Sequence, residues 1–125
     1  MKHDKRPPSV LTRDAALKKR PVKNEEVSET PSDDGSVLLS YTISVKPFFV
    51  GLIRRFSSRP DQPMTKKIQL DALGTQVWKL IDGRRSVRRI IDAFADTNQL
   101  HPQEAEVSVT QFLKSLGKKG LIGIK

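Results

Sequence analysis

The sequence predicts an α+β fold of the winged-helix type, in which a small three-stranded antiparallel sheet is followed by a three-helix bundle. Three observations carry this prediction. A segment rich in β-forming residues, Val37–Val45, follows turn chemistry at Pro31–Gly35. A short stretch at Thr65–Leu70 alternates as a strand does. The last 55 residues or so then show three successive helical periodicities.

Charge and composition divide the 125-residue chain into an arm and one domain. Residues 1–19 contain Pro7-Pro8 and several basic residues without periodicity, so we expect a disordered basic arm there and a domain over residues 20–125. The formal net charge of +9 is the sum of +6 for residues 1–24, −2 for residues 25–63 and +5 for residues 64–125. Because most of the excess positive charge lies in or near the arm, the net charge says little about what the domain binds.

Several classes of site are excluded by composition. The chain has no cysteine, which excludes disulfides, thiolate zinc sites and cysteine nucleophiles. The reducing cytoplasm is then the expected location. The charged N-terminus is not followed by an apolar segment of signal-peptide length, and no apolar run approaches the roughly 18 residues of a membrane span.

The predicted sheet is built from a hairpin and a third strand. The hairpin pairs a weak strand at about Glu26–Thr30 with Val37–Val45, and Gly35 in the turn can adopt a positive φ. The third strand, Thr65–Leu70, follows a loop at Ser57–Pro63.

The segment Phe48–Phe56 between these strands has apolar residues at helical spacing and Arg54 and Arg55 on the other side. It can be a basic amphipathic helix that touches a membrane or a partner protein. Alternatively, its apolar residues cap one end of the core. We favour the second interpretation, because so short a segment makes a poor membrane anchor.

The first predicted helix begins at Asp71, a favourable N-cap residue, and ends at Gly83, where a left-handed conformation is wanted. Ser86 is expected to cap the second helix, and Pro102 to occupy the first position of the third. The predicted buried stripes are Leu73, Val77, Leu80 and Ile81 in the first helix, Val87, Ile90, Ile91 and Phe94 in the second, and Ala105, Val109, Phe112, Leu113 and Leu116 in the third. Leu121–Ile124 is left as a short strand or tail.

A winged-helix DNA- or RNA-binding protein is the alternative that this element order raises. The third helix would be the recognition helix, yet it begins with Glu104 and Glu106 and has no basic residue before Lys114. An acidic helix start repels the phosphate backbone that supplies most of the affinity. The basic turn has two open interpretations: Arg84, Arg85, Arg88 and Arg89 hold phosphates, or they form a solvated face with ion pairs to Asp82 and Asp92. We therefore rank nucleic-acid binding second.

Residues 70–122, LDALGTQVWKLIDGRRSVRRIIDAFADTNQLHPQEAEVSVTQFLKSLGKKGLI, resemble the PqqD family. The resemblance rests on a leucine-rich first helix, the Asp82-Gly83 turn, a charged pair, the Ser86-Val87 helix start and the ending FLKSLGKKGLI. Arg20–Glu29 resembles the family's entry to its first strand more loosely. The basic arm and the Phe48–Phe56 insertion depart from the small family members, so the resemblance does not name the pathway.

The resemblance implies a peptide modification chaperone, also called a precursor-peptide recognition element. Such domains hold the leader of a ribosomally made precursor peptide and present it to a modifying enzyme, often a radical SAM enzyme. The leader pairs as an added strand on the edge of the third strand and also touches the third helix. An unpaired strand edge offers the N–H and C=O groups for this pairing. The candidate peptide-binding residues here are Lys66, Lys67, Ile68, Gln69 and Leu70 on the strand, and Val107, Ser108, Gln111, Lys114, Ser115 and Lys118 on the helix.

The chemistry of the remaining residues agrees with a protein that is not an enzyme. His101, next to Pro102, is expected to start a helix and not to bind a metal. The sequence has no convergent acid–base pair and no glycine-rich phosphate loop, so we expect no cofactor. A third interpretation is a pure assembly factor that docks an enzyme through Phe48–Phe56. The precursor, the enzyme and the oligomeric state, a homodimer included, are left open.

Overall fold

The structure is a computed structural model that describes residues 12–43 and 64–125. The chain forms two compact units, one of residues 24–75 and one of residues 1–23 together with 76–125. The segment Phe48–Phe56, with both of its interpretations, and the loop at Ser57–Pro63 lie outside the described residues.

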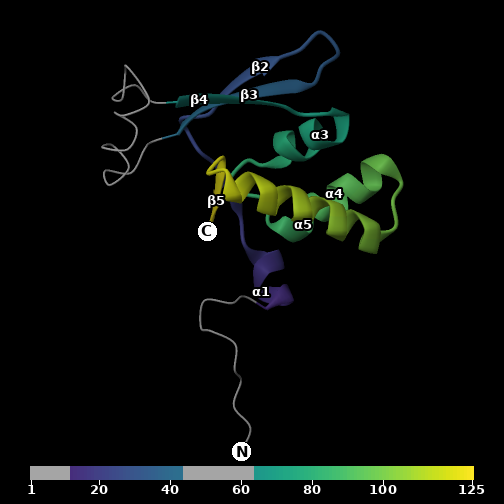
Figure 1. Ribbon diagram of the computed structural model, residues 1–125. Helices are drawn as coiled ribbons and strands as arrows, with labels where there is room; N and C mark the ends of the chain where they lie inside the picture. Colours follow the sequence, from purple (N-terminus) through teal and green to yellow (C-terminus); the bar gives the residue numbers. More distant parts are fainter. Residues whose placement is uncertain (1–11, 44–63) are drawn as a thin grey trace, which may run out of the picture. The chain divides into compact units, whose positions relative to one another are not determined.

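The first unit contains the predicted three-stranded antiparallel sheet, which is confirmed (Figure 1). Its strands are β2 (Ser28–Pro31), β3 (Val37–Ile43) and β4 (Met64–Gln69), with β3 in the centre. The first strand begins two residues later than the expected Glu26. The pairing register places Glu29 opposite Leu39, and Leu39 opposite Ile68.

The hairpin turn between β2 and β3 is closed by local hydrogen bonds. Gly35 has the predicted positive φ, +88°. The Asp34 carboxylate accepts hydrogen bonds from the hydroxyl and the backbone N–H of Ser36. These bonds stabilise the charged form and lower the pKa of Asp34. The turn thus fixes where β3 begins.

One face of the sheet is buried. Val37, Leu39 and Tyr41 alternate along β3, and all three side chains are buried. The buried Thr75 hydroxyl accepts a hydrogen bond from the N–H of Val37, at 3.1 Å. This bond satisfies a buried donor at the start of the central strand.

Helix α3 (Ala72–Leu80) begins as predicted at Asp71, whose carboxylate accepts the N–H of Gly74 at 2.7 Å. Its predicted buried stripe is partly wrong, because Leu73 is 50% exposed. Val77 and Ile81 are buried as predicted and Leu80 is half-buried, whereas Thr75 and Trp78 are buried in addition. Thr75 must face inward to accept the Val37 N–H, and this rotates Leu73, one turn before Val77, toward solvent.

In the second unit, a tight turn follows α3. Gly83 has φ +78°, as predicted for a left-handed helix stop. The Asp82 carboxylate accepts the backbone N–H groups of Arg84 and Arg85, and it also pairs with the Arg85 guanidinium at 3.2 Å. The interpretation of an ion pair within the turn is therefore confirmed for Asp82.

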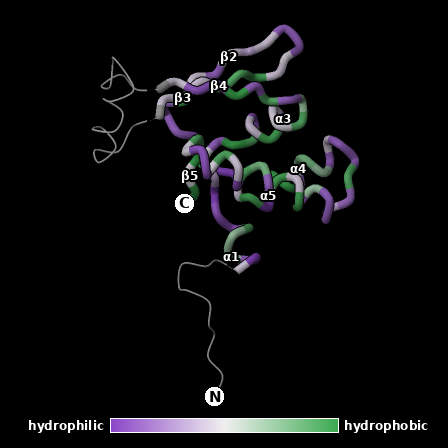
Figure 2. The backbone as a smooth tube through the Cα atoms, in the orientation of Figure 1, coloured by the Kyte–Doolittle hydropathy of each residue, from purple (hydrophilic) through white to green (hydrophobic). Residues whose placement is uncertain are grey.

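Helix α4 (Val87–Asn98) and helix α5 (Pro102–Lys118) pack on one another. The Ser86 side chain caps α4 by accepting the N–H of Arg89, and the His101 ring caps α5 by accepting the N–H of Gln103. Figure 2 shows hydrophobic and hydrophilic residues interspersed along both helices. The predicted stripe residues Val87, Ile90, Ile91, Phe94, Ala105, Val109, Leu113 and Leu116 are buried, and Phe112 is half-buried.

The disorder expected through residue 19 is corrected for residues 13–18, which form helix α1 (Arg13–Lys18). Thr12 caps α1, and Leu17 is buried. The chain continues into β1 (Pro21–Lys23), which pairs antiparallel with β5 (Ile122–Ile124). The sequence left Leu121–Ile124 as a short strand or tail, and the structure forms the strand there, whereas β1 and its pairing with β5 were not predicted. Within the two described ranges, no helix is long and apolar enough to cross a bilayer.

Candidate functional site

The outer edge of β4 is open: within residues 12–43 and 64–125, no strand pairs with it. The direction of its backbone groups follows from the register. Leu70 N–H donates to the carbonyl of Val37 at 2.9 Å. Hydrogen-bonded pairs alternate along an antiparallel ladder, so Ile68 and Lys66 also pair inward, with β3. The backbone N–H and C=O groups of the alternate residues, Thr65, Lys67 and Gln69, therefore point outward.

The other edge of the sheet, along β2, is less suited to accept a further strand. Ser32 N–H donates to the carbonyl of Ser36 at 2.7 Å, so the same alternation directs Glu29 and Pro31 outward. Proline has no N–H and cannot donate to an added strand. The β4 edge, which offers an outward N–H at each alternate residue, is the better template.

The side chains of β4 differ between its two faces. Lys66, Ile68 and Leu70 share the face of the buried β3 residues, and their exposure decreases along the strand from exposed Lys66 to half-buried Ile68 to buried Leu70. Lys67 lies on the opposite face and is exposed. The end of the strand thus belongs to the core, and its beginning is accessible.

Two of the candidate residues on β4 are held by local bonds. Leu70 is 5% exposed, and its N–H is already bonded to Val37. The amide nitrogen of Gln69 lies 3.0 Å from both the Ser36 hydroxyl and the Leu70 carbonyl. Leu70 therefore shapes the site without contacting a partner, and Gln69 can contribute its backbone but not its side chain.

The candidate residues on α5 belong to the second unit, whereas those on β4 belong to the first. All six are exposed: Val107, Ser108, Gln111, Lys114, Ser115 and Lys118. Val107 is 54% exposed, which is unusual for a large apolar side chain in the middle of a helix. A helix face with an exposed valine among small and basic side chains can contact an apolar or acidic peptide residue.

Metal chemistry finds no support in the described part of the chain. No group of three or more His, Asp or Glu side chains there could hold a metal ion. His101 accepts a backbone N–H at the start of α5, which confirms the expected helix-start role.

Residues 61–122 match the model of the family described as coenzyme PQQ synthesis protein D (PqqD). The resemblance to the PqqD family is confirmed. The matched segment runs from just before β4, through α3, α4 and α5, to the start of β5. Strands β2 and β3 lie outside the match, so the structure and not the family model places β4 at the edge of a sheet.

A solved structure, TbiB1 in complex with the TbiA(beta) leader peptide, has the same fold as this PqqD-like chain. The two chains superpose with a TM-score of 0.56 at 20% sequence identity, over 81% of this chain and 93% of the other. No curated protein matches the chain. The likeness confirms the predicted α+β fold.

One residue of the open β4 edge was missed in the sequence. Thr65 directs its backbone groups outward together with Lys67 and Gln69, although the candidate set began at Lys66. Alternation alone tells which side chains share a face. It does not tell which backbone groups point to the neighbouring strand, since that requires the register with β3.

Proposed function

We propose that this chain is a non-catalytic peptide chaperone. It binds the leader of a ribosomally made precursor peptide by strand addition on the edge of β4, and it presents the peptide to a modifying enzyme of the radical SAM class. The observation that carries the proposal is the row of outward backbone groups at Thr65, Lys67 and Gln69. The PqqD match and the likeness to a protein solved with a leader peptide support it.

Strand addition supplies affinity through the backbone and selectivity through side chains. Each new hydrogen bond contributes about 1 kcal/mol net. Lys66 and Lys67 are both exposed and favour an acidic leader. A single short strand buries less than the roughly 1,600 Å² of a standard interface, so we expect a dissociation constant on the order of micromolar.

The exposed flanks of α5 form the second part of the proposed site. Val107 offers an apolar contact, whereas Lys114 and Lys118 add positive charge. We propose that leader side chains contact these residues while the leader backbone pairs with β4. The absence of cysteine fits a role in the cytoplasm, and the proposed role needs no cofactor.

Nucleic-acid binding is less well supported. The helix that would enter a groove, α5, carries Glu104 and Glu106 near its start. Glu106 is engaged with Arg13 of α1 in a two-point ion pair, so this part of α5 is partly covered by another helix. Such a helix start is a poor partner for a phosphate backbone.

The experiment tests whether Lys67 binds the leader through its backbone N–H or through its side chain. Lys67→Pro removes an outward N–H but leaves the bonds between β3 and β4 intact, because Lys67 does not pair inward. Lys67→Ala removes the charge and keeps the N–H. Affinity is measured by isothermal titration calorimetry with a candidate leader peptide.

We expect Lys67→Pro to weaken binding at least about tenfold and Lys67→Ala to weaken it less than about threefold. Melting curves followed by fluorescence of Trp78, the single tryptophan, check that both variants fold. Equal affinity of Lys67→Pro and the unmodified protein would overturn strand addition on β4.

A further inference from the structure

A basic hollow lies in the second unit, formed where α1, the linker after it and the start of α4 meet. Its volume is about 690 Å³, within the range of pockets that hold ligands. The lining residues are Asp14, Leu17, Lys18, Arg20, Arg84, Ser86, Arg88 and Arg89. Five of these eight residues are cationic and one is acidic. None of them belongs to the proposed leader site.

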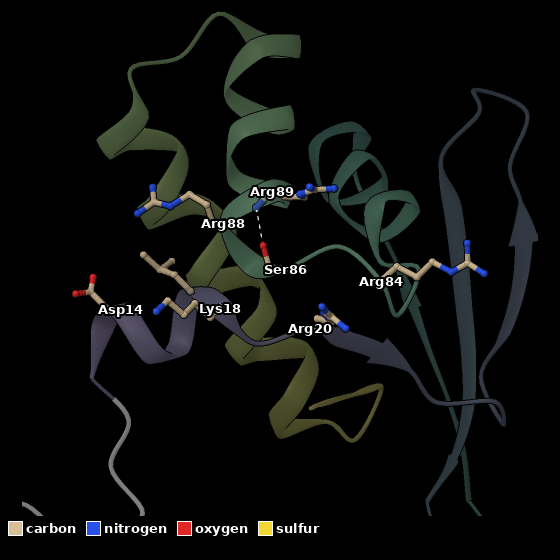
Figure 3. A pocket seen from close by; sticks show the side chains of 8 residues that line it. Asp14, Lys18, Arg20, Arg84, Ser86, Arg88 and Arg89 are labelled. Carbon is tan, nitrogen blue, oxygen red and sulfur yellow. Dashed lines mark hydrogen bonds between the residues drawn. The ribbon is translucent and has the colours of Figure 1, made fainter.

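The cations of the hollow form no ion pairs among the described residues. Within residues 12–43 and 64–125, no acid lies within 4.0 Å of the side-chain nitrogens of Lys18, Arg20 or the three arginines of the hollow. The charge of Arg88 nevertheless helps to lower the pKa of Glu106, after the larger effect of Arg13. The one acid, Asp14, lies 3.7 Å from Arg13, which does not line the hollow. Figure 3 shows Arg88 and Lys18 extending on the same side as Asp14, while Arg89 and Arg84 extend to the other side. The positive charge therefore surrounds the start of α4.

The frame beneath these side chains is fixed by backbone hydrogen bonds. The Lys19 carbonyl accepts the N–H of Val87 at 2.8 Å, which ties the linker to the first turn of α4. Arg20 and Lys125 exchange two backbone hydrogen bonds, of 2.8 and 3.0 Å. Leu17 is 4% exposed and anchors α1. The backbone frame thus holds five cationic side chains around one hollow, and all of them attract an anion bound there.

The surface continues into a second hollow. That hollow is lined by Ala15, Lys18, Lys19, Arg20 and Lys125, so the two share Lys18 and Arg20. A single inorganic anion needs far less room. Two adjoining hollows lined mainly by cations suit an extended segment that carries several carboxylates.

We propose that this basic hollow docks an acidic segment of the modifying enzyme, through residues that take no part in the proposed leader site. The inference rests on the proposed function for the identity of the partner. A nucleic-acid backbone fits less well, because Asp14 lines the hollow and Glu106 is the partner of the adjacent Arg13. Repeated phosphates would meet both acids, whereas a short acidic segment need not.

The test uses the full chain and fluorescein-labelled hexaglutamate, with hexaglutamine as the neutral control. Binding is followed by fluorescence anisotropy at low salt. The hollow variant is Lys18→Gln with Arg88→Gln. The matched control, Lys79→Gln with Lys119→Gln, removes the same charge from residues of the same unit that line neither hollow.

We expect hexaglutamate to bind, and the hollow variant to bind it roughly five- to tenfold more weakly than the control variant does. Equal weakening in both variants would show diffuse attraction to a basic protein and overturn the docking site. Tighter binding of a twelve-nucleotide single-stranded DNA than of hexaglutamate at the hollow would overturn it as well.

Two further measurements test whether the leader, or a second copy of this chain, occupies the basic hollow in place of the enzyme. The leader affinity should be the same in the hollow variant as in the control variant, and a selective loss would assign the hollow to the leader and overturn enzyme docking. If the leader binds neither the unmodified protein nor either variant, the result contradicts the proposed function and leaves the docking site standing. Sedimentation at low salt should show no self-association that depends on Lys18 and Arg88, since such a dimer would make a second copy the occupant.

Discussion

Arg13 and Glu106 form a two-point ion pair that joins residues 93 positions apart in the sequence. The Arg13 Nε lies 2.7 Å from Glu106 Oε2, and Nη2 lies 2.6 Å from Oε1. This geometry matches the planar guanidinium to the carboxylate and is the strongest form of such a pair. It holds α1, a helix of six residues, against the second turn of α5. So short a helix is marginal without tertiary contacts.

We predict that Glu106→Gln loosens α1 without unfolding the rest of its unit. Glutamine keeps the size of the side chain but loses the charge that Arg13 binds. Hydrogen exchange at the backbone amides of residues 15–19 should become severalfold faster, whereas exchange in the middle of α4 stays unchanged. Glu104→Gln is the matched control, because no ion pair of the described residues involves Glu104. Equal exchange at α1 in both variants would contradict the anchoring role.

The same pair should make α1 sensitive to acid. The hydrogen bond and charge of Arg13 lower the pKa of Glu106 below its ordinary value of 4.5, and Glu106 raises the pKa of Arg13. A lowered carboxyl pKa means that the stabilisation is complete above about pH 4.5 and is lost as the pH falls through the folded-state pKa. Protection of α1 should therefore be constant from pH 7 to 5 and should decrease below pH 4.

Gly83→Val should destabilise the second unit by about 1–2 kcal/mol or more, since Gly83 has φ +78° and side chains are strained there. A Cβ at Gly83 meets no atom within 4 Å, so the cost comes from the backbone and not from a clash. Gly83→Asn should lower the stability less than Gly83→Val does. Gly117→Ala, in helix α5 with no atom within 4 Å of the added Cβ, should be neutral or stabilising. Thermal melting measures all three, and an unchanged melting temperature for Gly83→Val would reject the left-handed stop.

Asp82→Asn should lower stability at neutral pH but not at low pH. The N–H groups of Arg85 and Arg84 lower the pKa of Asp82 below its ordinary value of 3.8. The contribution of the charged form is therefore present above about pH 4 and disappears as the pH falls through the folded-state pKa. Urea unfolding followed by Trp78 fluorescence should show a lower midpoint for Asp82→Asn at pH 7. The two midpoints should approach one another as the pH falls below 3.8, and a difference that stays constant as the pH falls would contradict the assigned cause.

Nucleic-acid binding, the alternative function, predicts a different response to salt. We expect at most weak binding that does not depend on base sequence and is lost when residues 1–11 are deleted. If specific binding persists after this deletion, a plot of log affinity against log salt concentration should have a slope of about −0.9 for each phosphate contacted. Anisotropy with a labelled duplex distinguishes the two cases, and tight binding without residues 1–11 would reverse the ranking.

The local part of the fold could be predicted from the sequence. The start of α4 at Ser86, the stop at Gly83 and the start of α5 at His101 depend on interactions within four residues, which a sequence displays directly. The buried stripe of α4 has the same origin, since its spacing is that of one helix face.

The parts that escaped prediction depend on distant partners. Helix α1 buries a single apolar residue, Leu17, and is held by packing on α4 and by the ion pair with Glu106 on α5. Strands β1 and β5 have three residues each, too few to show alternation, and they pair across almost the whole chain. Leu73 has the spacing of a buried residue but is exposed, because Thr75 must reach the N–H of Val37 on another strand.

The sequence predicted β4 as a strand, and the resemblance implied that its edge is the peptide site, but neither could show which backbone groups point outward. The lysines and Ile68 identify β4, while the outward direction of Lys67 and Gln69 follows only from the register with β3. The basic hollow was anticipated in part by the run of arginines from Arg84 to Arg89. The sequence could not show that Lys18 and Arg20 line the same hollow, since α1 was not predicted.

The central claim is that a leader peptide adds as a strand on β4. Amide chemical-shift titration of the labelled protein with a candidate leader tests it most directly. We expect shifts to concentrate at Lys66–Leu70, together with Thr65, and at Val107–Lys118, with half-saturation at a peptide concentration on the order of micromolar. Shifts confined to Arg84–Arg89, or none at millimolar peptide, would contradict the account.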